Sequence, residues 1–429
     1  MIKQIGFVLI ALWLCSTAKA QQPASTSDFA LVDGDRVVFY GDSITEQRLY
    51  TTDIENFVRT RFPDRHVLFF HSGVGGDRVS GGKYGPIDLR LHRDVFEHQP
   101  TVVTIMLGMN DGLYQAFDPD IFTSYKNGYV FIVNEIQKNF PQARLTLLKP
   151  SPYDDVTRPT MMVGGYNKVL QRFGGFVGEL AAEKKLDVAD LNAPVVQALE
   201  NANGKKSPLD TLLIPDRIHP GPAIHWIMAE SILQSWGAKP EVTFVHIAAG
   251  TKPTAQVSNT EVTQLSKDGD RLHWTQLDKA LPLPFEPLDA DPILRLALAS
   301  SDLIKALDTE TLRVSALPSG KYQLQIDGRE VGIFPAEELA AGVNLALLET
   351  PMLEQARRIN VDTQDKSSLD TQLFALSVKP EDQHNPEAAK DLREAEDHAL
   401  ARQLADAQPV AHHYEIIPTE RRATPKAAK

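Results

Sequence analysis

The stretch VFYGDSITEQ, residues 38–47, ends a hydrophobic run at Gly41 and places an acid and a serine directly after it. Ser, Asp and Gly are residues that any tight turn uses, and a serine beside Asp42 and Glu46 makes a chemically sensible helix N-cap. A residue that follows a buried strand can equally belong to a catalytic site. The stretch alone does not distinguish a capping Ser43 from a nucleophilic one, so the remaining sequence has to decide.

Short apolar runs like the one before Gly41 recur between residues 36 and 237. Short runs rich in Val, Ile, Leu and Phe, bounded by Gly, Pro or Asn, are typical of parallel strands buried on both faces. Their alternation with amphipathic segments predicts a flavodoxin-like three-layer α/β/α sandwich with a parallel sheet. We expect strands at 36–41, 65–73, 101–108 and 144–149, a weaker strand at 185–191, and helices at 49–61, 119–139, 161–185 and 223–236.

The pattern changes after residue 240. Residues 241–248 and 262–277 alternate with period two, and the second run contains an Asp268-Gly269 turn signal. Residues 322–334 form another predicted hairpin, which turns at Asp327-Gly328. This region is therefore expected to be a small antiparallel β addition.

A helical C-terminal addition follows the β region. Thr350-Pro351 and Asn385-Pro386 each combine a capping side chain with a proline at the first helical position. The second helix runs to about residue 407 through charged, alanine-rich sequence, and we expect both helices to be mainly solvated support. Residues 409–429 are rich in Pro and Lys, so we expect a disordered tail there.

The first 20 residues, MIKQIGFVLIALWLCSTAKA, have the layout of a secretory signal peptide that is cleaved after Ala20. The apolar stretch is too short to span a bilayer comfortably, although an uncleaved anchor is the alternative. Cleavage would remove Lys3, Lys19 and the single cysteine, which changes the formal charge from −12 to −14. We therefore expect a secreted or periplasmic protein without disulfides, and the negative charge disfavours nucleic acid as a partner.

Polar residues follow the predicted strands at the edge where ligands bind in open α/β sheets. Hydrolysis of an ester needs a nucleophile, a base to take its proton, and donors for the oxyanion. The four candidate blocks are GDSITE (41–46), HSGVGG (71–76), GMND (108–111) and DRIHP (216–220).

These blocks supply each of the required groups. Ser43 can be the nucleophile, His219 the base, and Asp216 the acceptor that fixes the tautomer of the imidazole. The backbone N–H groups of Ser43 and Gly73, together with the side-chain amide of Asn110, can form an oxyanion hole. No metal or organic cofactor is needed for this chemistry.

In this order, the four blocks resemble the SGNH/GDSL hydrolase superfamily over residues 33–237, about half of the chain. The resemblance implies the same roles: Ser43 as nucleophile, Ser43, Gly73 and Asn110 as the oxyanion hole, and Asp-x-x-His completing the triad. Two positions depart from the family pattern. His71 stands where the family often has Asn, which is expected to alter loop hydrogen bonds, and Ile224 stands where it often has Gly.

Each of these residues also has a purely structural interpretation that does not involve catalysis. Ser43 and Asp216 can be helix caps, Asn110 can be a turn residue, and His219 can be a surface histidine. The glycines at 73, 75 and 76 can be loop residues, but Arg78 occupies the position where a dinucleotide fingerprint needs glycine. Other histidines lack an acid three residues earlier in a suitable place, and no H-E-x-x-H motif is present.

Taken together, the sequence predicts an exported serine esterase that works through an acyl-enzyme. The family resemblance, together with export, implies that the acyl group is an O-acetyl group on a carbohydrate. The partner is then a small-molecule or polysaccharide ester, with no stable membrane span after signal cleavage. A lipase or thioesterase, or an inactive glycan-binding protein on the same fold, are the alternatives. The expected segments are a signal peptide (1–20), the hydrolase domain (27–240), an accessory β/α region (241–380), a charged helix (381–408) and the tail (409–429).

Overall fold

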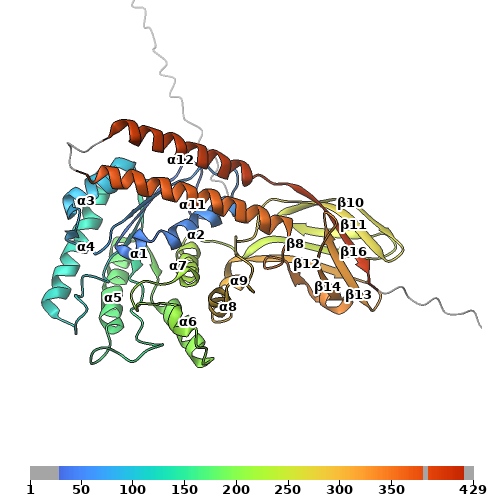
Figure 1. Ribbon diagram of the computed structural model, residues 1–429, viewed down its shortest axis with the longest axis horizontal. Coiled ribbons are helices and arrows are strands. Elements are labelled where there is room, and N and C mark those ends of the chain that lie inside the picture. Colours follow the sequence, from blue (N-terminus) through green and yellow to red (C-terminus); the bar gives the residue numbers. More distant parts are fainter. Residues whose placement is uncertain (1–28, 380–384, 420–429) are drawn as a thin grey trace, which may run out of the picture.

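A five-stranded parallel sheet forms the centre of the α/β part of the molecule (Figure 1). The computed structural model describes residues 29–379 and 385–419, so the predicted signal peptide lies outside the described residues. The strand order is β2-β1-β5-β6-β7, and every neighbouring pair is parallel. The strands are β1 (Arg36–Gly41), β2 (Leu68–Gly73), β5 (Val102–Met106), β6 (Arg144–Lys149) and β7 (Asp187–Asp190).

Helices flank this sheet, which confirms the predicted α/β class. α2 packs against α7, while α4 contacts both α3 and α5. The expected helix at 161–185 begins later, at Asn167, because Gly164 and Gly165 adopt positive φ angles that a helix does not accommodate. The helices are α1 (Ser43–Glu46), α2 (Leu49–Arg61), α3 (Ile87–Asp94), α4 (Pro119–Asn139), α5 (Asn167–Lys184), α6 (Ala193–Gly204) and α7 (Pro222–Ser235).

Short elements complete this part of the chain. A two-stranded ribbon of β3 (Gly81–Gly82) and β4 (Gly85–Pro86) precedes α3. Two 3₁₀ turns, η1 (Phe96–His98) and η2 (Asp210–Leu212), lie before β5 and α7 respectively.

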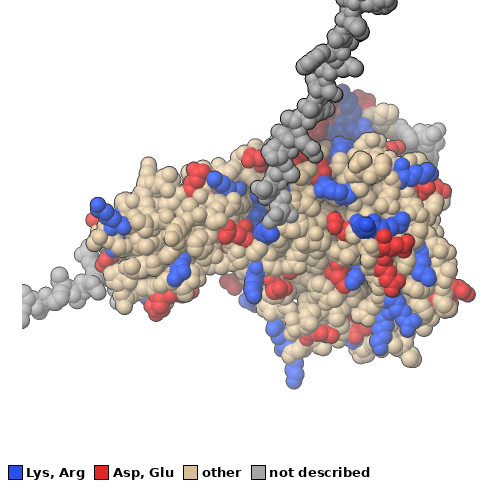
Figure 2. Space-filling model, turned by 180° about the vertical axis from the view of Figure 1, so that it is seen from behind, with Lys and Arg blue, Asp and Glu red and all other residues tan. Residues whose placement is uncertain are grey.

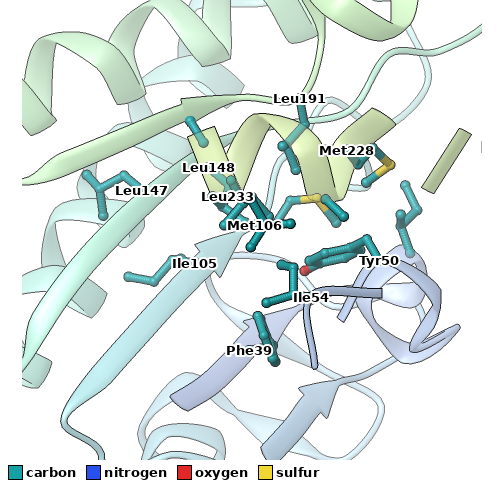
Figure 3. Packing of buried hydrophobic residues seen from close by; sticks show 14 of the residues in the cluster. Phe39, Tyr50, Ile54, Ile105, Met106, Leu147, Leu148, Leu191, Met228 and Leu233 are labelled. Carbon is teal, nitrogen blue, oxygen red and sulfur yellow. The ribbon is translucent and has the colours of Figure 1, made fainter. Parts of the chain in front are cut away.

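The core explains why the strands read as continuous apolar runs. Phe39 of β1 and Met106 of β5 are at most 1% exposed, and helices cover them. Figure 3 shows Leu233 of α7 and Ile54 of α2 packed over these strands. Burial on both faces leaves the sheet a rigid base, so the loops at its carboxyl edge are held in fixed positions.

A β module, formed by strands in residues 241–344 and 411–418, lies at the end of the molecule away from the α/β part (Figure 1). Its two sheets have the orders β10-β11-β16-β13-β14 and β15-β12-β8-β9, and they share a core that includes Trp274 and Leu324. The predicted hairpins are confirmed, since β10 pairs with β11 and β13 pairs with β14. The strands are β8 (Glu241–Ala248), β9 (Thr254–Ser258), β10 (Thr260–Asp268), β11 (Arg271–Asp278), β12 (Thr309–Ser315), β13 (Lys321–Ile326), β14 (Arg329–Pro335), β15 (Val343–Asn344) and β16 (Ala411–Pro418).

The C-terminal strand corrects one prediction. Residues 409–429 were expected to be disordered, but Ala411–Pro418 form β16, which pairs with both β11 and β13. Tyr414 and Ile416 are fully buried, and they alternate with polar residues as a half-buried strand requires. The prediction of disorder is wrong for residues 411–418, where the Pro- and Lys-rich flanks hid this short alternation, and residues 420–429 lie outside the described residues.

Two long helices connect the module back to the α/β part. α11 (Pro351–Ser377) and α12 (Pro386–Asp406) pack against each other, and α11 also packs on α2 (Figure 1). The predicted caps are confirmed, because Thr350 accepts from Leu353 N–H at 3.1 Å and Asn385 accepts from Ala388 N–H at 3.1 Å. Three short helices remain: α8 (Pro292–Leu298) and α9 (Leu303–Leu307) contact α7, whereas α10 (Ala336–Ala341) packs on β12 and β14 of the β module.

The prediction that these charged helices are mainly solvated is only half right. Their outer faces are exposed, but Lys366 of α11 donates to Glu55 of α2 at 3.1 Å, and Gln403 of α12 donates to the same carboxylate at 3.1 Å. Gln403 also accepts from Arg59 at 2.8 Å. We call Glu55, Arg59, Lys366 and Gln403 the buried polar network; it attaches the C-terminal helices to the α/β domain.

The surface carries mixed charge. Figure 2 shows acidic and basic side chains interspersed on the face turned away in Figure 1. Such mixing produces no extended single-sign field on that face. Across the described ranges 29–379 and 385–419, the helices lack the combination of length and apolar character that a membrane span needs.

Candidate active site

The capping question raised by VFYGDSITEQ is resolved by the residue before the serine. The N-cap of α1 is Asp42, whose carboxylate accepts from Ile44 N–H at 3.0 Å. Burial raises the pKa of Asp42 to about 7, even though this hydrogen bond opposes the shift. Ser43 is the first residue of the helix, so its hydroxyl is not needed for the cap and remains available for chemistry.

Ser43, His219 and Asp216 form a continuous chain of hydrogen bonds. The Nε2 atom of His219 lies 2.9 Å from Ser43 Oγ, and its Nδ1 atom lies 2.6 Å from Asp216 Oδ2. An ionised carboxylate only accepts, so Nδ1 carries the proton and Nε2 is left to accept from the serine hydroxyl. The arrangement is therefore that of a nucleophile, a general base and an orienting acid.

Asp216 also shapes the loop that carries His219. Its Oδ1 atom accepts from Ile218 N–H at 2.9 Å and from His219 N–H at 2.7 Å. Partial burial acts to raise the pKa of Asp216, but the hydrogen bonds from His219 and Ile218 outweigh burial and hold the pKa below its ordinary value. The carboxylate is thus kept ionised, as an orienting acid must be.

Two arginines that the sequence motifs did not reveal hold this loop in place. Arg217, with φ of 75°, donates to the carbonyls of Asp154 and Pro159 at 3.1 and 2.9 Å. Arg158 donates to the carbonyls of three residues that precede Asp216, at 2.7 to 2.9 Å: Thr211, Ile214 and Pro215. Arg217 lies inside the DRIHP block and Arg158 lies outside all four blocks, but only the fold shows that these two side chains join residues 154–159 to the catalytic loop.

Gly73 ends β2 opposite Gly41 in the parallel register. A Cβ atom at this position would overlap the backbone of Thr45 and Glu46, one turn beyond Ser43. Only glycine therefore allows the end of β2 to approach α1 this closely. The predicted role of Gly73 N–H as an oxyanion donor concerns a bound substrate and stays a prediction.

Asn110 follows β5 and is 9% exposed. Its Nδ2 group donates to the carbonyl of Asp77 at 3.1 Å, and its Oδ1 atom accepts from the hydroxyl of Tyr114 at 2.8 Å. The neighbouring Asp111 accepts from Val79 N–H at 2.9 Å, and burial raises its pKa to about 7. Asp111 thus joins two loops, whereas the oxyanion role of Asn110 remains a prediction.

His71 and His225, the two buried histidines that could compete with His219 for the role of general base, both have structural partners. His71 Nδ1 lies 2.8 Å from Thr51 Oγ1, so its departure from the family pattern ties β2 to α2. His225 Nδ1 accepts from Tyr50 N–H at 3.1 Å, which links α7 to α2. Burial lowers the pKa of His71 well below its ordinary value and that of His225 to about 3, so both rings stay neutral.

A metal site is not evident in the described part of the chain. Within residues 29–379 and 385–419, no three His, Cys, Asp or Glu side chains are grouped so that they could hold a metal ion. His412 in β16 instead contacts Asp327 at 2.6 Å, which links β16 to the turn between β13 and β14.

Comparisons with known proteins place this geometry in context. Residues 39–227 match the model of the GDSL-like Lipase/Acylhydrolase family, which confirms the resemblance expected from the four motifs. An acetylxylan esterase from Geobacillus stearothermophilus is 22% identical over 224 residues, which cover 48% of this chain and 94% of that protein.

Two solved structures extend the comparison. One, described as a gut microbial diltiazem-metabolizing enzyme, matches with a TM-score of 0.78 and 25% identity over 91% of this chain and 100% of that chain. This extent includes most of the β module and the C-terminal helices. A crystal structure of an acetylxylan esterase from Geobacillus stearothermophilus matches with a TM-score of 0.40 and 22% identity over 49% of this chain and 97% of that chain.

Proposed function

We propose that the chain, whose residues 39–227 match the GDSL-like lipase/acylhydrolase family, is an ester hydrolase, and specifically an exported serine esterase that deacetylates a carbohydrate. The observation that carries the proposal is the chain of hydrogen bonds from Ser43 Oγ through His219 to Asp216, at 2.9 and 2.6 Å. The layout of residues 1–20 supports export.

The first half of the reaction forms an acyl-enzyme. Ser43 Oγ attacks the ester carbonyl while His219 Nε2 accepts the hydroxyl proton. Negative charge develops on the carbonyl oxygen, where the N–H groups of Ser43 and Gly73 and the amide of Asn110 act as donors. His219, now protonated and held by Asp216, gives its proton to the departing alcohol.

The second half releases the acid. Water takes the place of the alcohol and loses a proton to His219 Nε2 as it attacks the acyl group on Ser43. Collapse of the second tetrahedral intermediate returns the proton from His219 to Ser43 Oγ and frees the carboxylic acid, which then ionises by losing its proton to solvent. Every proton transfer before that release therefore passes through His219.

The surroundings of the triad support a small acyl group. The side chains of His219 and Asp216 are 33% and 54% exposed, so the site opens directly to solvent. A cavity of about 370 Å³ is lined by Asp111 and Leu113, close to Asn110 in the chain, and one of about 660 Å³ is lined by His71 and Ser72, but no triad residue lines either of them. An open site suits a short acyl group on a polymer better than the long chain of a lipase substrate, and the relative from Geobacillus stearothermophilus is an acetylxylan esterase.

A panel of esters tests the proposal. Purified wild type and Ser43→Ala would be assayed on p-nitrophenyl esters from acetyl to decanoyl and on acetylated xylooligosaccharides. We expect turnover to be highest with acetyl groups and to vanish in Ser43→Ala, with the fold intact by circular dichroism. Full activity in the mutant would remove Ser43 from the reaction, while a preference for long chains would favour the lipase alternative.

A fluorophosphonate probe separates an enzyme from an inactive glycan-binding protein. The probe reacts with an activated serine, so wild type should be labelled and Ser43→Ala should not. An unlabelled wild type that binds xylooligosaccharides would contradict the proposed function.

A further inference from the structure

Tyr114 holds the amide of Asn110 in one orientation. The tyrosine hydroxyl donates to Oδ1 at 2.8 Å, while Nδ2 donates to the carbonyl of Asp77 at 3.1 Å. A flipped amide would set its oxygen against the carbonyl of Asp77, so the two partners together fix the assignment. Among the described residues Asp77 is the single acceptor of Nδ2, which leaves its second hydrogen for a ligand.

The backbone around Tyr114 is strained. Leu113 and Tyr114 both have φ of 54°, a left-handed conformation that side chains disfavour. Such a conformation persists only where the surroundings impose it. Strain of this kind gathers at functional sites, and here it occurs three and four residues after Asn110.

Tyr166 supports the strained loop from behind. Its hydroxyl donates to the carbonyl of Met109 at 2.6 Å, and its ring lies 5.1 Å from the ring of Tyr114. A Cβ atom at Gly112 would collide with the same hydroxyl. The buried side chain of Tyr166 therefore contacts residues 109–114 at three points, and these contacts hold the Tyr114 side chain in position.

We propose that Tyr114 is a positioning residue that orients and polarises the Asn110 amide, so that its free N–H points at the developing oxyanion. The inference rests on the proposed function. A hydrogen bond to the amide oxygen strengthens the amide N–H as a donor, since hydrogen bonds in a chain polarise one another. An oxyanion donor contributes most when its direction is set before the reaction begins.

The environment of Tyr114 keeps its hydroxyl protonated. Partial burial, reinforced by the negative charges of Asp42 and Asp216, raises its pKa to about 12. The side chain is nevertheless 38% exposed, so it stands at the open rim of the site. Tyr114 thus remains a donor to Asn110 over the whole pH range in which an esterase is assayed.

A double-mutant cycle tests the proposal, with Tyr114→Phe and Asn110→Ala made singly and together and assayed on p-nitrophenyl acetate. We expect Tyr114→Phe to lower kcat about 5- to 10-fold with little change in KM, which matches the loss of one hydrogen bond. Asn110→Ala should lower kcat about 10²-fold or more. In the Asn110→Ala background, Tyr114→Phe should have no further effect, because its target is gone.

Tyr153→Phe is the matched control. Tyr153 also contacts the ring of Tyr166, at 5.5 Å, but its hydroxyl faces Met161 Sδ at 3.1 Å, so its loss should leave kcat unchanged. Equal losses from Tyr114→Phe in both backgrounds, or an equal loss in Tyr153→Phe, would overturn the positioning role alone. A wild type inactive on every ester of the panel would overturn the proposed function and this inference together.

Discussion

The Nε2 atom of His219 lies 2.9 Å from the Oγ atom of Ser43, although 176 residues separate them along the chain. Ser43 begins α1 and is separated from β1 only by the cap residue Asp42, whereas His219 lies on the loop before α7. Ser43 lies at the carboxyl edge of the parallel sheet, and the packing of α7 on α2 and β7 brings the loop before α7 to the same place. Because Arg158 and Arg217 clamp the histidine loop through backbone carbonyls, the contact is preformed before any substrate binds.

Asp216→Asn should separate two roles of Asp216: holding the shape of the loop, and using its negative charge to fix the tautomer of His219. The asparagine can still accept the backbone N–H bonds of Ile218 and His219 through its oxygen, so the loop should keep its shape. Its NH₂ group would face Nδ1 of His219 and favour the tautomer that cannot accept from Ser43. We expect kcat for p-nitrophenyl acetate to fall about 10³- to 10⁴-fold at neutral pH, with an unchanged Tm.

Two outcomes for Asp216→Asn would contradict its predicted role as the orienting acid. An equal loss of kcat with a Tm lowered by several degrees would mean that Asp216 acts mainly on the loop. Retention of wild-type kcat would remove it from the triad.

Gly73→Ala should damage both the fold and the reaction. The added methyl group would overlap the backbone of Thr45 and Glu46, so α1 and the serine it carries would have to move. A displacement of about 1 Å at a catalytic group can cost about 10²-fold in rate. We expect kcat/KM to fall by at least this factor and Tm to fall as well.

Gly175→Ala provides the matched control for that substitution. Gly175 lies within α5, and a Cβ atom there would meet nothing within 4 Å. Alanine favours a helix over glycine by about 0.5–1 kcal/mol, so this variant should keep full activity and melt slightly higher. Wild-type activity in Gly73→Ala would contradict the close approach of β2 to α1.

Lys366→Met tests whether the buried polar network attaches the C-terminal helices. The substitution removes the ammonium group that lies 3.1 Å from Glu55, and both side chains are at most 4% exposed. Loss of one partner of a buried pair costs about 3 kcal/mol or more. We therefore expect Tm, measured by calorimetry, to fall by several degrees.

Arg402→Met is the control for charge alone. Arg402 of α12 is 55% exposed and pairs with Asp362 and Asp365 on the neighbouring helix. Exposed ion pairs contribute about 0–1 kcal/mol, so its loss should barely change Tm. If Tm fell equally in Lys366→Met and Arg402→Met, the buried polar network would contribute no more to stability than an exposed ion pair.

The sequence predicted those features that depend on local pattern. Apolar runs such as 101–108 identified the parallel strands, and Asp-Gly pairs identified two hairpins, because each pattern reflects a local conformational requirement. Ser43 followed from its position after a strand, and Asp216 and His219 from a block that precedes a helix. The identity of the cap was not predictable, because Asp42 and Ser43 are equally suited to it and only the backbone geometry selects Asp42.

Features that depend on distant contacts could not be read from the sequence. Tyr414 and Ile416 lie in a short stretch that becomes a strand only because β11 and β13 flank it. Lys366 and Gln403 look like solvated helix residues until α2 presents Glu55 to them. Tyr114 reaches Asn110 only through a strained backbone that no propensity favours.

Glu310 should make stability depend on pH. The side chain is fully buried on β12, and within the described residues neither carboxyl oxygen has a hydrogen-bond partner. Burial, reinforced by the charges of Asp278 and Asp308, raises its pKa well above the ordinary value of 4.5, although Arg61 opposes the shift. The folded protein therefore holds a proton that the unfolded chain loses, and the resulting stabilisation is full at low pH and declines as pH rises above 4.5.

Glu310→Gln removes this titration and keeps the shape of the side chain. Wild-type Tm should fall between pH 5 and pH 8, and the fall should be smaller in Glu310→Gln because one buried proton no longer has to be held. Glu337→Gln, at an exposed position on α10, should show the wild-type slope. If Glu310→Gln also kept the wild-type slope in calorimetric scans, Glu310 would not be protonated in the folded state, and the β module would have to accommodate a buried charge beside Asp278.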